Sequence, residues 1–253
     1  MRETRTVSQR GIADVVSALE DRLDGLPVAL AHRRTFIATY LRTTRAVGRA
    51  VDVGLFEDGD WVARWDVVFA ELYLVAHDAE TAGEVVPRPW RETFNASPQL
   101  HPLQHVLLGI NAHINYDLPQ SLVSVIPAAE FADPAVLERR RRDHERIDAV
   151  LASRVAAEDA ELRTLTHVAL ADRLLTPVNR LASRRLLRES RRKVWHNTFA
   201  LHDARNTSAE LYDERLRELE VLSASRISDL LEPGPVLLRL AAGGFGVRLP
   251  PPA

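Results

Sequence analysis

The sequence contains no cysteine at all. This absence excludes a disulfide framework, a thiol nucleophile, a thiolate zinc site and an iron–sulfur cluster. Lysine is almost absent as well, since Lys193 is the only one, and this use of arginine in its place is typical of a GC-rich bacterial genome. The charges nearly cancel, with 33 Lys and Arg residues against 35 Asp and Glu residues. No net field therefore draws the protein onto nucleic acid or an anionic membrane.

Long apolar runs are also missing. The stretches 67–76 and 106–114 are interrupted by Glu71 and Asn111 and fall short of the roughly 18 residues that span a bilayer. Residues 1–10 are polar and lack the apolar stretch of a signal peptide. We therefore expect a cytoplasmic protein without a membrane span.

Apolar residues recur with helical periodicity, and the alternating runs that would predict strands are missing. The sequence predicts an all-α protein with one multi-helix domain, orthogonal or bundle-like, over residues 1–253. We expect its core at about 29–231 and a C-terminal tail at 233–253, and a weaker alternative places a boundary near 128–133. Caps and prolines predict helices at about 8–23, 29–53, 60–79, 90–94, 102–118, 133–165, 176–202 and 208–231, with caps at Ser8, Asp60, Asp133 and Ser208.

The predicted helix that begins at Pro102 carries two polar rows beside an apolar stripe. On a helical wheel of about 100° per residue, His113 and Asp117 share one flank of that stripe. The helix is expected to be buried almost all round and to end or kink at Pro119, because proline lacks the N–H and clashes with the preceding turn. The other flank carries three amides, those of Gln104, Asn111 and Asn115.

A second apolar helix, at 65–78, also carries buried polar groups. Asp66, Tyr73 and His77 lie within about 40° of one another on its wheel. An unpartnered buried polar group costs about 1 to 3 kcal/mol, so such sets rarely arise by accident. The two helices could face each other across one site, or each set could be a satisfied network in the core.

These residues predict acid–base chemistry on a bound small molecule. We expect Asp66 or Asp117 to act as acid or base and His113 to carry the proton. His113 and Asp117 also have a spacing that can bind a divalent ion such as zinc, although His144 and Asp148 repeat it in a helix expected to be solvated. The expected substrate-binding residues are Asn111, Asn115, Gln104, Tyr73, His77 and Trp195.

Other features carry less chemistry. There is no P-loop, nucleophile elbow, dinucleotide fingerprint or H-E-x-x-H motif. The arginines at 139–142 and the basic cluster at 184–193 are expected on solvated helix faces, and no motif that reads nucleic acid accompanies them. Tyr40 falls in the apolar stripe of its predicted helix, with Phe36 and Ile37, and is expected to be core.

The two polar segments carry a resemblance to a known family. The residues that carry it are Asp66, Phe69, Ala70, Leu72 and Tyr73 in the first segment, then Pro102, Leu103, Gln104, Leu108, Gly109 and the run Asn111–Pro119. In these residues the sequence resembles a bacterial, mostly actinobacterial family known only as a domain of unknown function. The resemblance extends over about 36–204 and implies an all-α fold, without an established activity.

The run Ala112–Pro119 is also similar, more distantly, to the histidine, aspartate and proline segment of the zinc-dependent phospholipase C and P1-type nuclease group. Those proteins place a further histidine ligand after the proline, where this sequence has Gln120 and Ser121. A zinc-dependent phosphoester hydrolase would therefore need another ligand, for which Asp66 or His77 is the candidate.

Three functions remain open at this point. The leading expectation is an enzyme of bacterial metabolism, specialised metabolism included, that acts on a small molecule. Its expected class is lyase, cyclase or hydrolase. The first alternative is a non-catalytic helical protein that binds a ligand or a partner. The second alternative is the metal-dependent phosphoester hydrolase. We expect a small-molecule ligand and no nucleic acid, and we leave a homo-oligomer open.

Overall fold

The computed structural model describes residues 11–147, 150, 170–234, 239 and 243–252, and of residues 170–188 it describes the backbone alone. Every regular element within these residues is a helix. This confirms the all-α prediction. The cap expected at Ser8 and the helix end expected at Leu165 lie outside the described residues.

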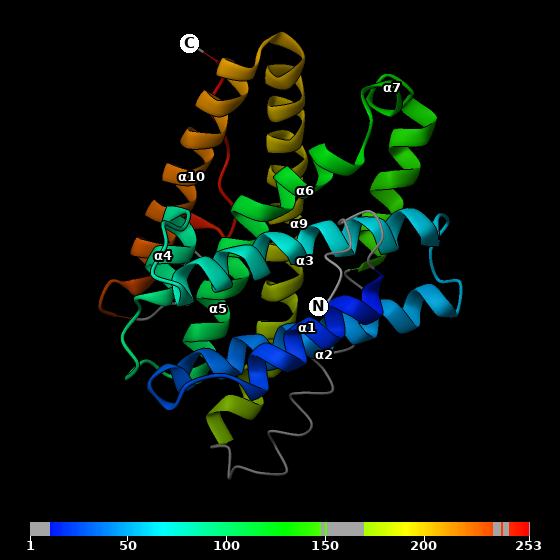
Figure 1. Ribbon diagram of the computed structural model, residues 1–253. Coiled ribbons are helices and arrows are strands. Elements are labelled where there is room, and N and C mark those ends of the chain that lie inside the picture. The colour runs from blue at the N-terminus through cyan, green and yellow to red at the C-terminus, as the bar shows by residue number, and fades with distance from the viewer. Residues whose placement is uncertain (1–10, 148–149, 151–169, 235–238, 240–242, 253) are drawn as a thin grey trace, which may run out of the picture.

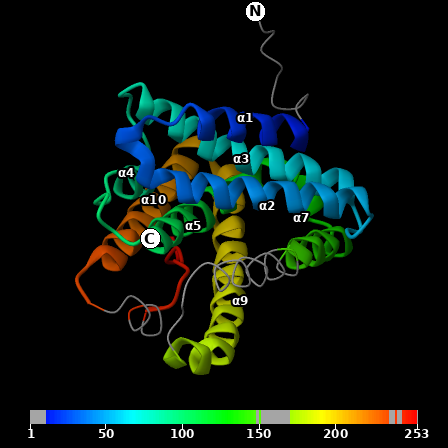
Figure 2. The ribbon, with the colours of Figure 1, turned by 90° about the horizontal axis from the view of Figure 1, so that it is seen from below.

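Three helices form a layer at the N-terminal side of the fold. Helices α1 (Ile12–Asp24), α2 (Arg34–Asp52) and α3 (Gly59–Thr81) lie side by side in both views, and a 3-10 turn, η2 (Val28–Arg33), leads into α2 (Figures 1 and 2). The cap of α3 is Asp58, whose side chain accepts a hydrogen bond from the Trp61 backbone N–H. The cap predicted at Asp60 is therefore wrong by two residues, because Asp60 already lies inside the helix.

The central helix continues through Pro119. It consists of α5 (Pro102–Ala112), a π-helical segment η3 (His113–Asp117) and α6 (Leu118–Val125). The predicted end near Leu118 is wrong, because the wider π turn lets the helix pass the proline: the Leu118 N–H donates to the carbonyl of His113, five residues earlier. The side-chain amide of Gln120 donates to the Tyr116 carbonyl at 2.8 Å and so satisfies a carbonyl of this turn.

Two long helices cross the N-terminal layer steeply. Helix α9 (Leu170–Thr207) begins before the start predicted at Thr176, and α10 (Ala209–Leu231) begins after the predicted cap, Ser208, which accepts from the Leu211 N–H. The shorter elements are α4 (Arg88–Phe94), α7 (Ala128–Phe131) and a helical stretch at 134–147. Figure 1 shows α9 and α10 side by side, with the non-helical residues 244–252 running between them.

The core lies where the central helix meets the N-terminal layer. Trp61, Trp90 and Tyr73 are its largest fully buried side chains. The burial predicted for the central helix is wrong at its first turn, because Leu103 is 59% exposed there. No helix within the described residues is long and apolar enough to cross a membrane.

Candidate functional site

The π-helical segment holds a hydrogen-bonded pair of titratable side chains. The Nδ1 atom of His113 lies 2.8 Å from Oδ2 of Asp117, and the indole N–H of Trp90 donates to the same oxygen at 2.9 Å. Because Oδ2 accepts from the indole, we assign the shared proton to Nδ1 of His113. The Nε2 atom of His113 then presents a lone pair. It is buried and has no hydrogen-bond partner.

Aromatic rings fix the position of His113. The ring of Phe69 stacks on it with centroids 3.6 Å apart and an interplanar angle of 8°, and Tyr40 meets it edge-on at 4.8 Å. Burial lowers the pKa of His113, although the hydrogen bond to Asp117 acts in the opposite direction. Burial likewise raises the pKa of Asp117, opposed by its hydrogen bonds to His113 and Trp90. His113 is thus rigid and biased toward its neutral, proton-accepting form.

Asp66 belongs to the same region because it lies three residues before Phe69 on α3. It is 9% exposed, which is more than His113 at 4% or Asp117 at 1%, so it lies nearest to solvent. Its Oδ2 atom is buried without a partner. Burial alone raises the pKa of Asp66 to about 7. A carboxyl group with this pKa can donate or accept a proton near neutral pH.

Tyr40 is a member of the site that the sequence did not single out, and Thr44 lies on the same face of α2. Both lie on α2, one turn apart, and the hydroxyl groups of both are buried without a partner. Burial raises the pKa of Tyr40 well above its usual value, and the carboxylates of Asp66 and Asp117 raise it further. The Tyr40 hydroxyl therefore stays protonated and interacts electrostatically with both Asp66 and Asp117. Spacing places Thr44 on the face of Tyr40, but only the packing of α2 shows that this face borders the site.

Tyr73 and His77 extend the site along α3. Tyr73 is 1% exposed, and its ring centroid lies 6.2 Å from that of His113 and 5.9 Å from that of His77. Burial lowers the pKa of His77, whose Nδ1 atom lies 3.3 Å from Asp78 and whose Nε2 atom has no partner. The buried face predicted for α3 is thus present, and Tyr73 connects its far end to His113.

The amides of Asn111 and Asn115 hold the C-terminal tail. Both donate to the carbonyl of Phe245, at 3.0 and 3.1 Å, and Asn115 also accepts from the Val247 N–H at 3.2 Å. Asn197 on α9 continues the pattern by bonding the Val247 carbonyl and the Leu249 N–H. Substrate binding by Asn111 and Asn115 stays a prediction, and in the structure these amides recognise backbone of the same chain.

Gln104 lies away from this region. Its Oε1 atom accepts from the backbone N–H of His101 at 3.1 Å, so the side chain closes the N-terminus of α5. An amide three residues after a helix start is a common cap partner, and this spacing was visible in the sequence. The structure does not bring Gln104 together with Asp66 or His113.

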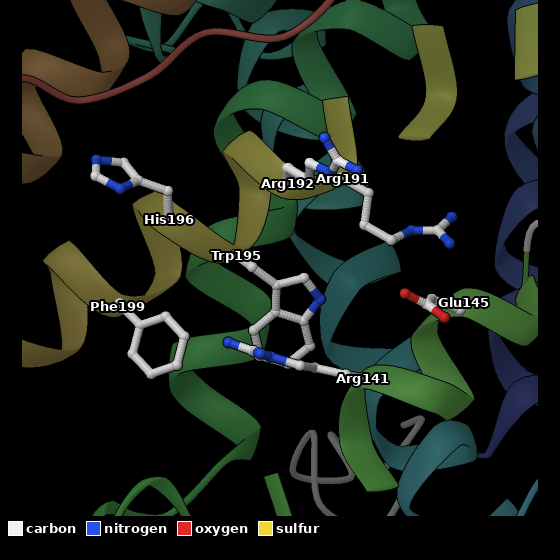
Figure 3. A pocket seen from close by; sticks show the side chains of 7 residues that line it. All are labelled: Arg141, Glu145, Arg191, Arg192, Trp195, His196 and Phe199. Atoms are coloured by element: carbon white, nitrogen blue, oxygen red, sulfur yellow. The ribbon is translucent and has the colours of Figure 1, made fainter. Parts of the chain in front are cut away.

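Trp195 lies on α9 and borders a pocket there. A chain of ring contacts leads there from the buried site, with centroid distances of 6.3 Å from Phe69 to Trp65, 5.2 Å from Trp65 to His144 and 5.7 Å from His144 to Trp195. The structure therefore does not place Trp195 beside His113. The pocket is lined by Arg141, Glu145, Arg191, Arg192, Trp195, His196 and Phe199 (Figure 3).

The helical stretch at 134–147 is less solvated than predicted. Arg140, Asp143 and His144 are all buried, at 3%, 0% and 3% exposure. Asp143 accepts hydrogen bonds from the backbone N–H groups of Glu57 and Asp58, both at 2.8 Å. The sequence could not show this, because these partners lie more than 80 residues earlier in the chain and their contact depends on the fold.

A metal would need more ligands than His113 and Asp117 supply. These two side chains bond each other, and within the residues that the structure describes no group of three or more His, Cys, Asp or Glu side chains could hold a metal ion. Zinc sites use three or four protein ligands. The donor set therefore does not fit a zinc centre at this pair.

The site offers a proton acceptor, a proton donor and a hydroxyl group, all of them buried. His113 Nε2, Asp66 and the Tyr40 hydroxyl come from three different elements and have buried atoms without partners. Shifted pKa values and unpartnered buried groups cluster at functional sites, as do π-helical turns. The arrangement can move a proton on a small molecule that reaches these atoms.

Comparison with known proteins gives the chain a family without giving it an activity. No curated protein and no solved structure matches it. Residues 12–233 match the model of the family of unknown function DUF5995. The match covers both helices that carry the buried polar groups, and the chain therefore belongs to the DUF5995 family.

Proposed function

We propose that the protein is an enzyme that moves a proton on a small organic molecule at the site formed by Asp66, His113 and Asp117. The observation that carries this proposal is that two elements in contact, α3 and the π-helical segment, carry a buried carboxyl group whose pKa burial raises to about 7 and a rigid histidine whose pKa burial lowers. Groups whose environments shift their pKa values toward neutrality are suited to general acid–base catalysis.

Each residue has a separate role in this proposal. Nε2 of His113 accepts a proton from the substrate, while Asp117 and Trp90 hold the ring in the required tautomer. Asp66 in its protonated form returns a proton or donates a hydrogen bond to a substrate oxygen. The Tyr40 hydroxyl, which stays protonated, binds a developing negative charge.

A non-catalytic binding protein is the second candidate. It is favoured by the closure of the site, because His113 and Asp117 are almost fully buried. In that case the same atoms would bind a polar ligand and never exchange a proton with it. The phosphoester hydrolase, to which the distant similarity pointed, lacks this kind of support, since no third ligand joins His113 and Asp117 within the described part of the chain.

The test is a turnover screen with matched variants. Purified protein is incubated with pooled small polar metabolites, and substrate loss and product formation are followed by mass spectrometry. We expect His113→Gln and Asp66→Asn each to lower the rate by at least about a hundredfold, the usual contribution of a general acid or base. Gln104→Ala, on the same helix but outside the site, is the control and should retain the parent rate.

Two outcomes separate the candidates. Ligands that bind the parent, lose affinity in both variants and are never converted would favour the binding protein. Conversion or binding that is equal in the parent, His113→Gln and Asp66→Asn would contradict both candidates and assign the buried groups to stability. Circular dichroism of each variant establishes that the comparison is between folded proteins.

A further inference from the structure

Residues 244–252 of the C-terminal tail are bound through their backbone by side chains of other elements. Asn115 donates to the carbonyl of Phe245 at 3.1 Å and accepts from the N–H of Val247 at 3.2 Å. Asn197 repeats this geometry two residues further on, with the carbonyl of Val247 at 3.1 Å and the N–H of Leu249 at 2.9 Å. A β-strand bonds its neighbour through the same backbone groups, so the two amides hold the tail as a neighbouring strand would.

Further side chains of α9 and α10 also bond the backbone of this segment. The carbonyls of residues 244, 246, 249 and 250 accept hydrogen bonds from Arg226, Lys193, His196 and Arg215, in that order. We call these four side chains, together with Asn111, Asn115 and Asn197, the tail-binding surface. Because its hydrogen bonds end on backbone atoms, they can form with any segment that takes up the same extended path.

Alternate side chains of the tail enter the protein. Phe245 and Leu249 are 7% and 0% exposed, and Val247 packs against the apolar cluster that contains Leu249. Arg248, which lies between the last two, is exposed. In an extended chain every second side chain points to the same side. The tail-binding surface therefore selects apolar residues at three alternate positions of the segment that it binds.

A glycine follows the first of these positions because the tail passes close to α9 there. A Cβ atom on Gly246 would lie 3.0 Å from Cα of Ser190 and 3.0 Å from Cδ of Lys193, which is tighter than ordinary van der Waals contact. The Ser190 atom belongs to the backbone of α9 and cannot turn aside as a flexible side chain can. The selected pattern is therefore apolar, glycine, apolar, any residue, apolar.

The tail and the surface that binds it differ in their relation to the family. Every side chain of the tail-binding surface lies within residues 12–233, which match the family, whereas the tail follows them. The surface is thus part of the matched domain, and the segment that occupies it lies outside the match. Binding of an extended segment through its main chain, with pockets for alternate side chains, is also how many proteins take up a segment of another chain.

We propose that the tail-binding surface is a docking site for an extended segment of another protein chain, and that the tail occupies it as a displaceable ligand of the same chain. The partner segment carries the pattern of the tail, with an uncharged inward face. While the tail is docked it excludes the partner, because a tethered segment competes at an effective concentration of about millimolar. This proposal goes beyond the proton transfer at His113, which gives no role to the tail-binding surface.

The experiment uses the full chain with a weakened tail and supplies the tail sequence as a peptide. In Leu249→Asp a carboxylate replaces a fully buried side chain, so the tail should undock while the tail-binding surface stays intact. A fluorescein-labelled peptide with the sequence of residues 243–252 is titrated into this variant and into the parent, and its fluorescence anisotropy is followed. We expect saturable binding to Leu249→Asp, and binding at least about a hundredfold weaker to the parent, where the tail competes.

Two matched pairs test how the peptide is recognised. N-methylation of the peptide at Leu249 removes the N–H that donates to Asn197 and should weaken binding about tenfold, whereas N-methylation at the exposed Arg248 should leave it unchanged. Asn197→Ala, added to the Leu249→Asp chain, should also weaken binding about tenfold. Asn206→Ala is its control, because Asn206 lies on the same helix and contacts His202 instead of the tail.

Gly246→Val in the full chain is a second tail variant, which weakens docking without adding a charge. It should bind the unchanged peptide as Leu249→Asp does, and the same change made in the peptide should weaken its binding at least about tenfold, because the added carbons meet α9. Circular dichroism shows whether each variant is folded, and amide hydrogen exchange at Val247 shows whether its tail has undocked.

Three results would overturn the proposal. The first is no saturable binding to a folded variant with an undocked tail, and the second is equal binding to the parent. The third is an equal loss with both methylated peptides, which would show that the backbone is not recognised. Unfolding of both tail variants would also overturn it, because the tail would then be a fixed part of the fold.

Discussion

The central helix has two polar flanks with different chemistry. On one flank His113 and Asp117 face α3 and α4, and Nε2 of His113 lacks a partner. On the other flank Asn111 and Asn115 face the C-terminal tail and bond its backbone. Both flanks are buried to a similar degree.

The difference lies in how each flank uses its hydrogen-bonding capacity. The two amides donate to the backbone carbonyl of Phe245, and Asn115 accepts from the backbone N–H of Val247. Because these hydrogen bonds satisfy polar backbone groups of the tail, this flank stabilises the fold. The titratable flank has shifted pKa values and an unpartnered ring nitrogen, Nε2 of His113, which costs free energy without stabilising the fold. The amide flank also leaves one buried atom without a partner, Oδ1 of Asn111, but both of its side chains bond the tail. Burial and polarity therefore do not distinguish function from structure here, whereas the partners do.

The largest expected effect is that of neutralising Asp66. Its folded pKa, at about 7, lies above the usual 3.8, so between these values the unfolded chain releases a proton that the folded protein keeps. The free energy of unfolding then falls as pH rises through this window and levels off above it. Asp66→Asn has no carboxyl group to titrate and so removes this loss. The free energy of unfolding of the variant, relative to that of the parent, should therefore rise by about 3 kcal/mol between about pH 5 and about pH 8.

Urea unfolding at both pH values measures this gain. Asp213→Asn, an exposed position on α10, is the control and should show no comparable change. A pH-independent difference between Asp66→Asn and the parent would mean that Asp66 is ionised in the folded protein over the whole range. Helix α3, which the titratable flank faces, would then carry an ordinary ionised carboxylate, and the titratable flank would lose the proton donor proposed beside it.

A smaller effect is expected at Gly109, which lets α5 approach α2 closely. A Cβ atom there would lie 2.3 Å from Cδ2 of Phe36, and Phe36 packs on Tyr40 with ring centroids 6.0 Å apart. Gly109→Ala should cost about 2 kcal/mol through overpacking. It should also shift the NMR signals of His113 while those of Val247 stay in place.

Gly59→Ala provides the comparison, because a Cβ atom there would meet Val51 at an ordinary 3.5 Å. Its stability should stay near that of the parent. If the two alanine variants were equally stable, the close approach of α2 to the central helix would not constrain the titratable flank.

The smallest effect separates the two asparagines of the tail flank. Asn115 bonds both Phe245 and Val247, whereas Asn111 bonds Phe245 alone. Asn115→Ala should therefore cost about 1 kcal/mol more than Asn111→Ala, the net value of one hydrogen bond. Amide hydrogen exchange at Val247 should quicken only in Asn115→Ala. Equal exchange in both variants would show that the tail does not depend on these bonds.

Much of the site could be predicted from local spacing. The His113–Asp117 pair and the Asp66–Tyr73–His77 face follow from helical geometry within one helix each, and the structure has both. The π turn could not be predicted, since an internal proline more often ends a helix. The tail contact could not be predicted either, because Asn115 and Phe245 are 130 residues apart. The sequence predicts Tyr40 to be a core residue, because a tyrosine in an apolar stripe usually packs in the core.

The ionisation of Asp66 is the property on which the account of the site depends most directly. The side-chain carboxyl of Asp66 can be followed by carbon-13 NMR over a pH titration, with Asp66→Asn used to assign the signal. We predict a midpoint near pH 7, as its burial requires. A midpoint near the ordinary aspartate value of about 4 would contradict the account, because Asp66 would then be an ordinary ionised carboxylate and no proton donor.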